Sequence, residues 1–281
     1  MTDRELSRGV RRPSPTFGAG RRPFVHAILG AALAAIAIAG CSSAKLPTHT
    51  ADVAAYSSQY QTGTQGLVAA GVFADFYDRY ADCTKSSSGT CAVFVCPAQR
   101  PAPPEAPAAG ILTFSGTRES IVLATPYLYD PPAVQRTQFP AGATLTLKGS
   151  GGATIPAFTA TVLGGPSLRL TSPLLDGVTT LPVARGSTLE LTWEAGTFGE
   201  IVAHIDEDTT DSRIEVECRF PATAGKGSVS TIPFSVGPGQ LDVRGESRTT
   251  VDSGDYRITF RAFTTALTPS GDRTRVAIDL Q

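Results

Sequence analysis

The sequence predicts an all-β fold, built as an antiparallel sandwich that follows an N-terminal signal segment. Gly (28) and Pro (21) are frequent among the 281 residues, which suits a turn-rich fold and not a helical bundle. From residue 67 onward, short segments with apolar residues at every second position follow one another between turn residues. No stretch after residue 67 repeats its apolar residues every 3.6 positions over three turns, as an amphipathic helix would.

Residues 1–40 have the parts of a secretory signal peptide. Residues 1–23 hold six Arg and two acidic residues, a local charge of +4, and an uncharged apolar run occupies residues 24–40. A basic segment, an apolar segment and small residues before a break are typical of such a signal. The run is near the lower length limit for crossing a bilayer and is rich in Ala and Gly, so an uncleaved anchor helix is the less favoured alternative.

The end of this run resembles the lipobox of bacterial lipoproteins. Ile38-Ala39-Gly40-Cys41 places an aliphatic residue and two small residues before a Cys. The resemblance implies that Cys41 is lipidated, that cleavage precedes it, and that its new amino group is acylated. Several acyl chains on one residue give stable membrane anchoring. Ser42 in place of Asp implies the outer membrane, by resemblance to the sorting rule of Gram-negative lipoproteins.

The route of export stays open. Gly20-Arg21-Arg22-Pro23 with Phe24 and Val25 resembles a twin-arginine signal, but Gly stands where Ser or Thr is usual. The general secretory route is the alternative.

Four regions are predicted: a signal peptide (1–40), a flexible tether (41–66), a Cys-containing β lobe (67–177) and a β-sandwich lobe (178–281). The tether is small and polar without a sustained period, as flexible linkers are. About seven strands fall after residue 178, which is one immunoglobulin-like sandwich. Six or seven strands fall before it, so the body has either one lobe or two packed lobes. The Pro-rich stretch 97–109 is either a stiff connection or an ordinary surface loop.

The individual strands are predicted from alternation. In residues 187–194, Leu189, Leu191 and Trp193 share one face, and Trp193 is expected to be a buried packing anchor. Residues 213–220 repeat this pattern. Further strands are predicted at 67–77, 91–96, 110–114, 120–125, 144–147, 155–163, 200–206, 255–264 and 274–280.

The cysteines that remain after Cys41 predict two disulfides. Cys83, Cys91, Cys96 and Cys218 are an even set, as expected for an exported chain, and they allow three pairings. The favoured pairing joins Cys83 to Cys91 across a short polar loop and Cys96 to Cys218. Pairing Cys83 with Cys96 and Cys91 with Cys218 is almost as favourable. A zinc site is disfavoured because no C-x-x-C pair occurs and no His lies nearby.

No catalytic residue and no cofactor are predicted. His204 is the only His held on a predicted strand, and no nucleophile elbow, zinc-binding H-E-x-x-H or phosphate loop occurs. A satisfied or exposed strand histidine is the preferred interpretation. A polymer hydrolase is an alternative that would require carboxylates such as Glu194, Glu200 and Asp206 to converge in a cleft.

One acidic segment suggests a metal hypothesis. Asp206, Asp208 and Asp211 supply alternate carboxylates, the hard oxygen ligands that Ca²⁺ prefers. The segment lacks the Gly and the terminal Glu of an EF-hand, so a solvated acidic turn is the preferred interpretation.

Charge excludes nucleic acid as a partner. The chain carries −1, and loss of residues 1–40 leaves −5 without any Lys/Arg-rich run. The expected partners are the membrane, through Cys41, and an envelope polymer or protein.

The mature sequence resembles lipoproteins of unassigned role in myxobacterial-type, high-GC Gram-negative bacteria. The segments that carry the resemblance are Phe139-Pro140-Ala141-Gly142, Ile155-Pro156-Ala157-Phe158, Leu189-Glu190-Leu191-Thr192-Trp193 and Cys218-Arg219-Phe220. The resemblance implies an exported, anchored β protein and brings no catalytic residues. A non-enzymatic binding or structural module of the cell envelope is therefore expected, with a polymer hydrolase and a calcium-dependent adhesion module as alternatives.

Overall fold

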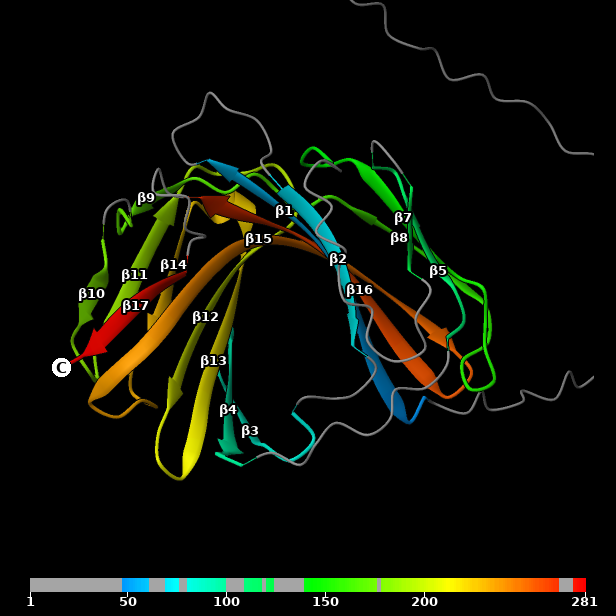
Figure 1. The fold of residues 1–281 in the computed structure, drawn as a ribbon. Helices are drawn as coiled ribbons and strands as arrows, with labels where there is room; N and C mark the ends of the chain where they lie inside the picture. Colours follow the sequence, from blue (N-terminus) through cyan, green and yellow to red (C-terminus); the bar gives the residue numbers. More distant parts are fainter. Residues whose placement is uncertain are drawn as a thin grey trace, which may run out of the picture. The chain divides into compact units, whose positions relative to one another are not determined.

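The described residues of the protein form three β-sheets in a computed structural model (Figure 1). The structure describes residues 47–60, 69–75, 80–99, 109–117, 120–123, 139–175, 178–267 and 275–281. These residues form no α-helix, only a short 3₁₀ turn, η1 (Ala222–Ala224). The strands are β1 (His49–Tyr60), β2 (Ala69–Asp75), β3 (Thr84–Ser88), β4 (Cys91–Pro97), β5 (Leu112–Ser115), β6 (Ile121–Leu123), β7 (Thr144–Gly149), β8 (Phe158–Leu163), β9 (Leu170–Ser172), β10 (Thr180–Val183), β11 (Thr188–Trp193), β12 (Glu200–Asp208), β13 (Ser212–Pro221), β14 (Lys226–Ser230), β15 (Gly237–Ser253), β16 (Tyr256–Leu267) and β17 (Arg275–Leu280).

The largest sheet, called the main sheet below, has ten strands. Its order is β2-β1-β16-β15-β12-β13-β4-β3, with β17 beside β15 and β10 beside β17. A four-stranded sheet has the order β6-β5-β7-β8, and a three-stranded sheet has the order β14-β11-β9. The all-β, sandwich-like prediction is therefore confirmed. The pairs β1–β16 and β10–β17 are parallel, so the main sheet is mixed and not purely antiparallel.

One side of the main sheet, its apolar face, packs against both smaller sheets. Near β1 and β16, this face forms a hydrophobic cluster with the four-stranded sheet, in which Phe260 meets Phe114 edge to face with ring centroids 5.6 Å apart. Near β12 and β13, it forms a second cluster with the three-stranded sheet. Trp193 is buried there, as predicted, and its Nε1–H donates to the Ala222 carbonyl at 2.9 Å.

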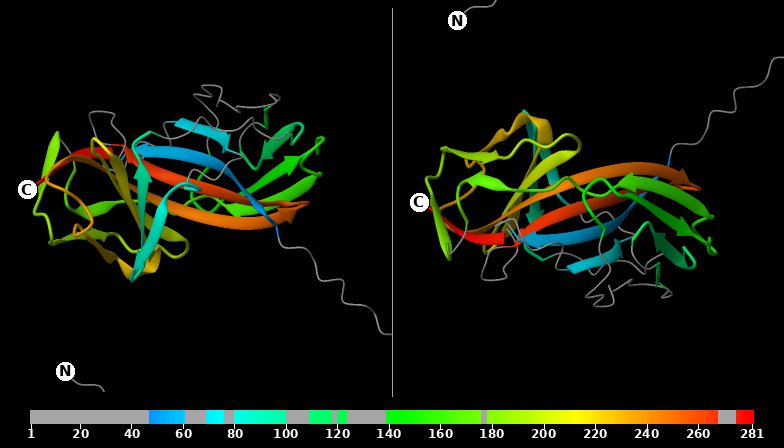
Figure 2. Two further views of the ribbon diagram at one scale, coloured as in Figure 1. Left: turned by 90° about the horizontal axis from the view of Figure 1, so that it is seen from below. Right: turned by 90° about the horizontal axis from the view of Figure 1, so that it is seen from above.

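The long strands β15 and β16 run between the two ends of the main sheet (Figure 2). Leu241 near the start of β15 belongs to the second cluster, whereas Val251 near its end packs against the first. Between them, the Gly165-Pro166 segment crosses the main sheet at Gly245. A Cβ at residue 245 would clash with the backbone of Pro166, so the crossing requires Gly there. The Thr264 hydroxyl fixes this crossing by donating to the Gly165 carbonyl at 3.1 Å.

The predicted boundary at residue 177 does not separate the two clusters. Cys91 and Val93 of β4, from the first half of the chain, pack in the second cluster, whereas Ile258 and Phe260 of β16 pack in the first. The described residues all fall in one compact unit, residues 44–281.

The prediction of a flexible tether at 41–66 is wrong for residues 49–60. These residues form β1, which pairs with β16 and β2. Ala51, Val53 and Ala55 are buried in the first cluster. Their small side chains alternate with polar ones only weakly, so the strand lacks the strong pattern of β11. Pairing with a partner some 200 residues away decides its conformation, and local propensity does not report such pairing.

The longest strand, β15, was not among the predicted strands. Its sequence begins Gly-Pro-Gly and continues with charged residues, a composition that is typical of turns. Strands β3, β9, β10 and β14 were also not predicted. The strands that lie close to the predicted ranges are β2, β4, β5, β6, β7, β8, β11, β12, β13, β16 and β17.

Two disulfides form, as predicted, but not in the favoured pairing. Cys83 joins Cys96, and Cys91 joins Cys218. The β3–β4 hairpin explains the first pair, because Thr84 faces Val95 and the preceding Cys83 is therefore opposite Cys96. Cys91 and Cys218 are cross-strand partners of β4 and β13, with Cα atoms 3.9 Å apart. Cys83 and Cys91 lie at opposite ends of the hairpin, which prevents the favoured pairing.

Candidate functional site

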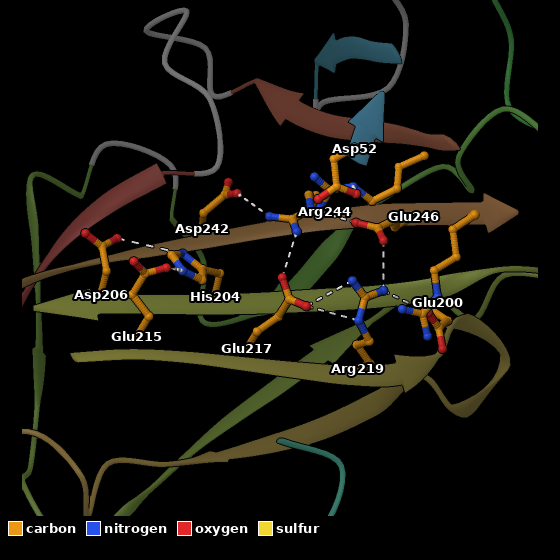
Figure 3. Close-up of polar contacts among 12 residues, drawn as sticks. Asp52, Glu200, His204, Asp206, Glu215, Glu217, Arg219, Asp242, Arg244 and Glu246 are labelled. Carbon is orange, nitrogen blue, oxygen red and sulfur yellow. Dashed lines mark hydrogen bonds and ion pairs between the residues drawn. The ribbon is translucent and has the colours of Figure 1, made fainter. Parts of the chain in front are cut away.

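The side of the main sheet opposite both clusters, its charged face, carries a network of Arg and acidic residues (Figure 3). Alternation along β12 defines the two faces: Ile201, Ala203 and Ile205 point to the second cluster, so Val202 and His204 point to the charged face. On the neighbouring strands β13 and β15, every second residue points to this face. These residues include Arg213, Glu215, Glu217 and Arg219 of β13 and Asp242, Arg244 and Glu246 of β15.

Four of these residues close a ring of alternating charge, called the charge ring below. Glu217 accepts from Arg219 at 2.9 Å and from Arg244 at 3.1 Å. Glu246 accepts from Arg219 at 2.8 Å and from Arg244 at 3.1 Å. Each carboxylate therefore bridges both guanidinium groups. Glu200 adds a further contact to Arg219 at 3.0 Å.

Strand β12, which lies between β13 and β15, makes the charge ring possible. Val202 of β12 is the cross-strand partner of Arg219 on one side and of Arg244 on the other. Its side chain is short, apolar and completely buried. Long side chains from β13 and β15 can therefore meet over it, and a larger residue at this position would separate them.

The side chains of the charge ring are at most 17% exposed, and they are ionised. Glu246 is fully buried, and burial alone would raise its pKa, but the charges of Arg244 and Arg219 outweigh burial and lower it. Burial likewise raises the pKa of Glu217, and Arg219 and Arg244 bring it down to about 2. Burial alone would lower the pKa of Arg219, but the nearby carboxylates of Glu246 and Glu217 outweigh burial and raise it. Close pairing thus compensates the loss of hydration of all four charges.

His204 lies beside this ring between two acidic residues. Its Nε2 is 3.0 Å from Glu215 Oε2, and its Nδ1 is 3.8 Å from Asp206 Oδ1. Glu215 also accepts from the Tyr80 hydroxyl at 2.9 Å, and the Tyr80 ring stacks on Phe94. Both ring nitrogens of His204 face carboxylates, so neither is placed to activate a Ser or Cys nucleophile. A buried, satisfied strand histidine, one of the two expected environments, is what the structure contains.

The three carboxylates of the calcium hypothesis do not come together. Asp206 is buried and binds Arg213 Nη2 at 3.1 Å, whereas Asp208 and Asp211 are exposed near the β12–β13 turn. That turn is held by Thr209, whose hydroxyl donates to the Ser212 carbonyl at 2.7 Å. In the described part of the chain, no group of three or more His, Cys, Asp or Glu side chains could hold a metal ion.

The carboxylates of the hydrolase alternative are also separated. Glu200 and Asp206 lie six residues apart on one strand, which corresponds to about 20 Å. Glycosidase carboxylates lie roughly 5–10 Å apart. Glu194 is exposed and pairs with Arg169 at 2.8 Å. Glu200 and Asp206 therefore do not form a catalytic pair.

A groove of about 520 Å³ opens next to the charge ring. Its walls are formed by consecutive residues of β8, of the start of β12 and of β15, together with Phe198. The lining residues are Thr161, Val162, Leu163, Phe198, Gly199, Glu200, Glu246, Ser247, Arg248 and Thr249. This volume falls in the range of sites that bind small ligands or short segments.

Comparison of the chain with protein-family models, with curated proteins and with solved structures finds no match. Cys41 and the predicted signal lie outside the described residues. The described residues include no helix with the length and apolar character that crossing a bilayer requires.

The charge ring itself was not predicted. The signal was present in the sequence, because Glu215, Glu217 and Arg219 alternate with the apolar residues of β13, and Asp242, Arg244 and Glu246 alternate along β15. Such alternation ordinarily indicates a solvent-facing side, and nothing local reveals that this side is buried as well.

Proposed function

We propose that the chain is an exported, lipid-anchored protein whose β body serves as a non-enzymatic binding or structural module of the cell envelope. The anchor is Cys41, at the end of the signal segment, and Ser42 favours the outer membrane. The partner is an envelope polymer or protein.

The observation that carries the proposal is the pair of disulfides. Cys91–Cys218 joins two strands inside the second cluster, and Cys83–Cys96 ties the β3–β4 edge hairpin. Disulfides of this structural kind persist in oxidising compartments and are rare in the cytosol. They use four of the five Cys, which leaves Cys41 of the lipobox as the fifth.

The state of the charged face supports a role without catalysis. A general acid that works near neutral pH needs a raised carboxyl pKa. In the charge ring the pKa values of Glu217 and Glu246 are lowered, so both groups stay ionised. Glu217 and Glu246 therefore form ion pairs between strands and are not placed as general acids.

The test is metabolic labelling of the full chain, expressed in a Gram-negative host, with an alkyne-bearing fatty acid. The wild type is expected to incorporate label, to sediment with membranes and to accumulate as a larger precursor when lipoprotein signal peptidase is inhibited. Cys41→Ala should abolish the labelling.

A matched control removes other cysteines. The double substitution Cys83→Ser and Cys96→Ser opens the edge disulfide and should leave labelling intact. Labelling that survives Cys41→Ala, or a chain that stays in the cytosol with its thiols reduced, would refute the proposal.

A further inference from the structure

The groove beside the charge ring lies along a part of β15 that, over the described ranges of the chain, has a strand partner on one side only. The ladder between β12 and β15 ends at the pair Glu200 and Glu246. Strand β15 continues to Ser253 and pairs there with β16 on its other side. Among the described residues, no strand pairs with the β12 side of β15 beyond Glu246. The position that β12 would occupy if it continued is called the open lane below.

The hydrogen-bond pattern identifies the backbone groups that face the open lane. The Ala222 N–H donates to the Gly199 carbonyl at 3.0 Å, so the odd-numbered residues of β12 bond to β13. The even-numbered residues therefore bond to β15, where Glu200 faces Glu246. Alternation then directs the N–H and C=O of Arg248 into the open lane.

The opposite wall is a second strand edge. The Gly164 N–H donates to the Ala143 carbonyl at 2.7 Å, so the even-numbered residues of β8 bond to β7. The N–H and C=O of Thr161 and Leu163 point away from β7, and β8 is the last strand of its sheet among the residues that the structure describes. Exposed strand edges of this kind are templates for pairing with another chain.

The lining of the groove agrees with this geometry. Residues 246–249 of β15 and 161–163 of β8 line it consecutively. Side chains of a strand alternate between faces, so consecutive residues meet the same space only along the strand's edge. The groove therefore runs beside the two backbones and does not lie on the face of either sheet.

Arg248 is the cation of the groove lining that can meet an acidic occupant, because the two lining carboxylates, Glu200 and Glu246, already bind Arg219 at 3.0 and 2.8 Å. Arg248 and Arg261 are cross-strand neighbours on the charged face, where like charges repel. Their carboxylate contacts are long: Arg248 Nε lies 3.8 Å from Glu200 Oε2, and Arg261 Nε lies 3.4 Å from Asp52 Oδ1. Glu200 already binds Arg219 more closely, at 3.0 Å. Arg248 is 48% exposed and available to an incoming carboxylate.

We propose that this groove binds an extended polypeptide segment that carries an acidic residue, and that the segment adds to the edge of β15 as a strand in the open lane. Main-chain hydrogen bonds to Arg248 hold the segment, and its acidic side chain pairs with the Arg248 guanidinium on the charged face. Alternate side chains of the segment turn the other way, toward Val162 and Phe198. Strand addition with alternating pockets is a general mode of peptide recognition.

This inference rests on the proposed binding role and names the class of partner. It does not depend on the lipid anchor, since the peptide assay reads the groove and the labelling assay reads Cys41. Failure of one assay therefore leaves the other result standing.

The test is fluorescence anisotropy with the purified full chain in detergent micelles. The probe is a fluorescein-labelled peptide, Val-Thr-Val-Asp-Val-Thr-Val. A second peptide has Lys in place of Asp, and a third is the acidic peptide N-methylated at every second residue. The wild type is expected to bind the acidic peptide roughly fivefold more tightly than the Lys peptide, as a partly exposed ion pair allows. N-methylation should weaken binding by at least about tenfold, because it removes donors from one edge.

Charge reversal is the decisive variant. Arg248→Glu should reverse the preference and favour the Lys peptide, and Arg248→Gln should remove the preference altogether. Arg257→Gln is the matched control, because Arg257 is exposed to a similar extent and pairs with Asp252 outside the groove lining. It should leave both affinities unchanged, and circular dichroism melts verify that each variant folds.

Three results would overturn the inference. One is the absence of saturable binding of the acidic peptide to the wild type. Another is equal binding of the N-methylated peptide, which would exclude strand pairing. The third is displacement of the probe by an N-acetylglucosamine hexamer but not by unlabelled acidic peptide, which would assign the groove to a glycan.

Discussion

Strand β12 is buried on both of its sides, and the two sides are stabilised by opposite chemistry. On the apolar face, Ile201, Ala203 and Ile205 pack into a hydrophobic cluster that the three-stranded sheet covers. On the charged face, Val202 lies beneath a ring of two Arg and two Glu that satisfy one another. The apolar face draws its stability from area removed from water, whereas the charged face depends on every charge keeping its partner.

The difference has a consequence for substitutions. Loss of one apolar side chain leaves a cavity that its neighbours partly fill. Loss of one ring carboxylate leaves two guanidinium groups with incomplete pairing, because the other carboxylates near them, Glu200 and Asp242, are already engaged with these groups. On the apolar face, the loss of unfolding free energy should therefore grow with the side-chain volume that is removed. On the charged face, it should grow with the number of charges that lose their partners.

The largest effect is expected on the apolar face. Phe260→Ala removes a fully buried ring that packs edge to face on Phe114, and it should lower the free energy of unfolding by about 4 kcal/mol. Urea denaturation of the full chain measures it. Leu163→Ala, at an apolar position that is 44% exposed, is the control and should lose less than about 1 kcal/mol. Equal losses would contradict the described packing.

The next effect is expected on the charged face. Glu246→Gln keeps the shape of the side chain but removes the charge that bridges Arg219 and Arg244, and it should cost about 3 kcal/mol. The same urea titration measures it. Replacing all four ring residues together with Met or Leu should restore much of the loss, because no charge is left unpaired. A single substitution without effect would mean that water already solvates these groups.

A pH titration in the acid range separates the two faces, because the charge ring holds carboxylates and the two hydrophobic clusters hold none. The Glu217 pKa is lowered from 4.5 to about 2, so its contribution is complete above pH 4.5 and is lost as the pH falls toward 2. Unfolding free energy should fall by about 3 kcal/mol over this window because of this group. Urea titrations at pH 7, 4.5, 3 and 2 measure the fall. Glu217→Gln should flatten it, and an equal slope in both proteins would contradict the assignment.

The smallest effect is expected from an exposed ion pair on the same sheet. Asp252 binds Arg257 at 3.0 Å, and both side chains are about half exposed. Asp252→Asn should leave the urea midpoint unchanged within error, since exposed pairs contribute little. A shift as large as that of Glu246→Gln would show that burial is not what distinguishes the charge ring.

Strands with strict alternation could be predicted from the sequence. In β11 and β13, large apolar residues alternate with polar ones, and the pattern alone locates both strands and the burial of Trp193. Strands β1 and β15 could not be predicted in this way. Small residues in β1 and Gly and Pro in β15 hide their alternation, and long-range pairing with β16 decides both conformations.

The candidate site was predictable only in part. His204 and the alternating charges of β13 could be recognised in the sequence. Their meeting with Arg244 and Glu246 could not, because it depends on the register of β12 between its two neighbours. The disulfide pairing has the same origin, since Cys91 and Cys218 are joined by a register that no local pattern encodes.

We propose that this β body is exported, oxidised and anchored at Cys41. The decisive experiment is intact-mass spectrometry of the full chain, expressed in a Gram-negative host and purified from its membranes. The expected mass is that of a chain that begins at Cys41, carries acyl groups on that residue and has lost the hydrogens of two disulfides, Cys83–Cys96 and Cys91–Cys218. A chain that retains residues 1–40, lacks lipid and has free thiols at all five Cys would contradict it.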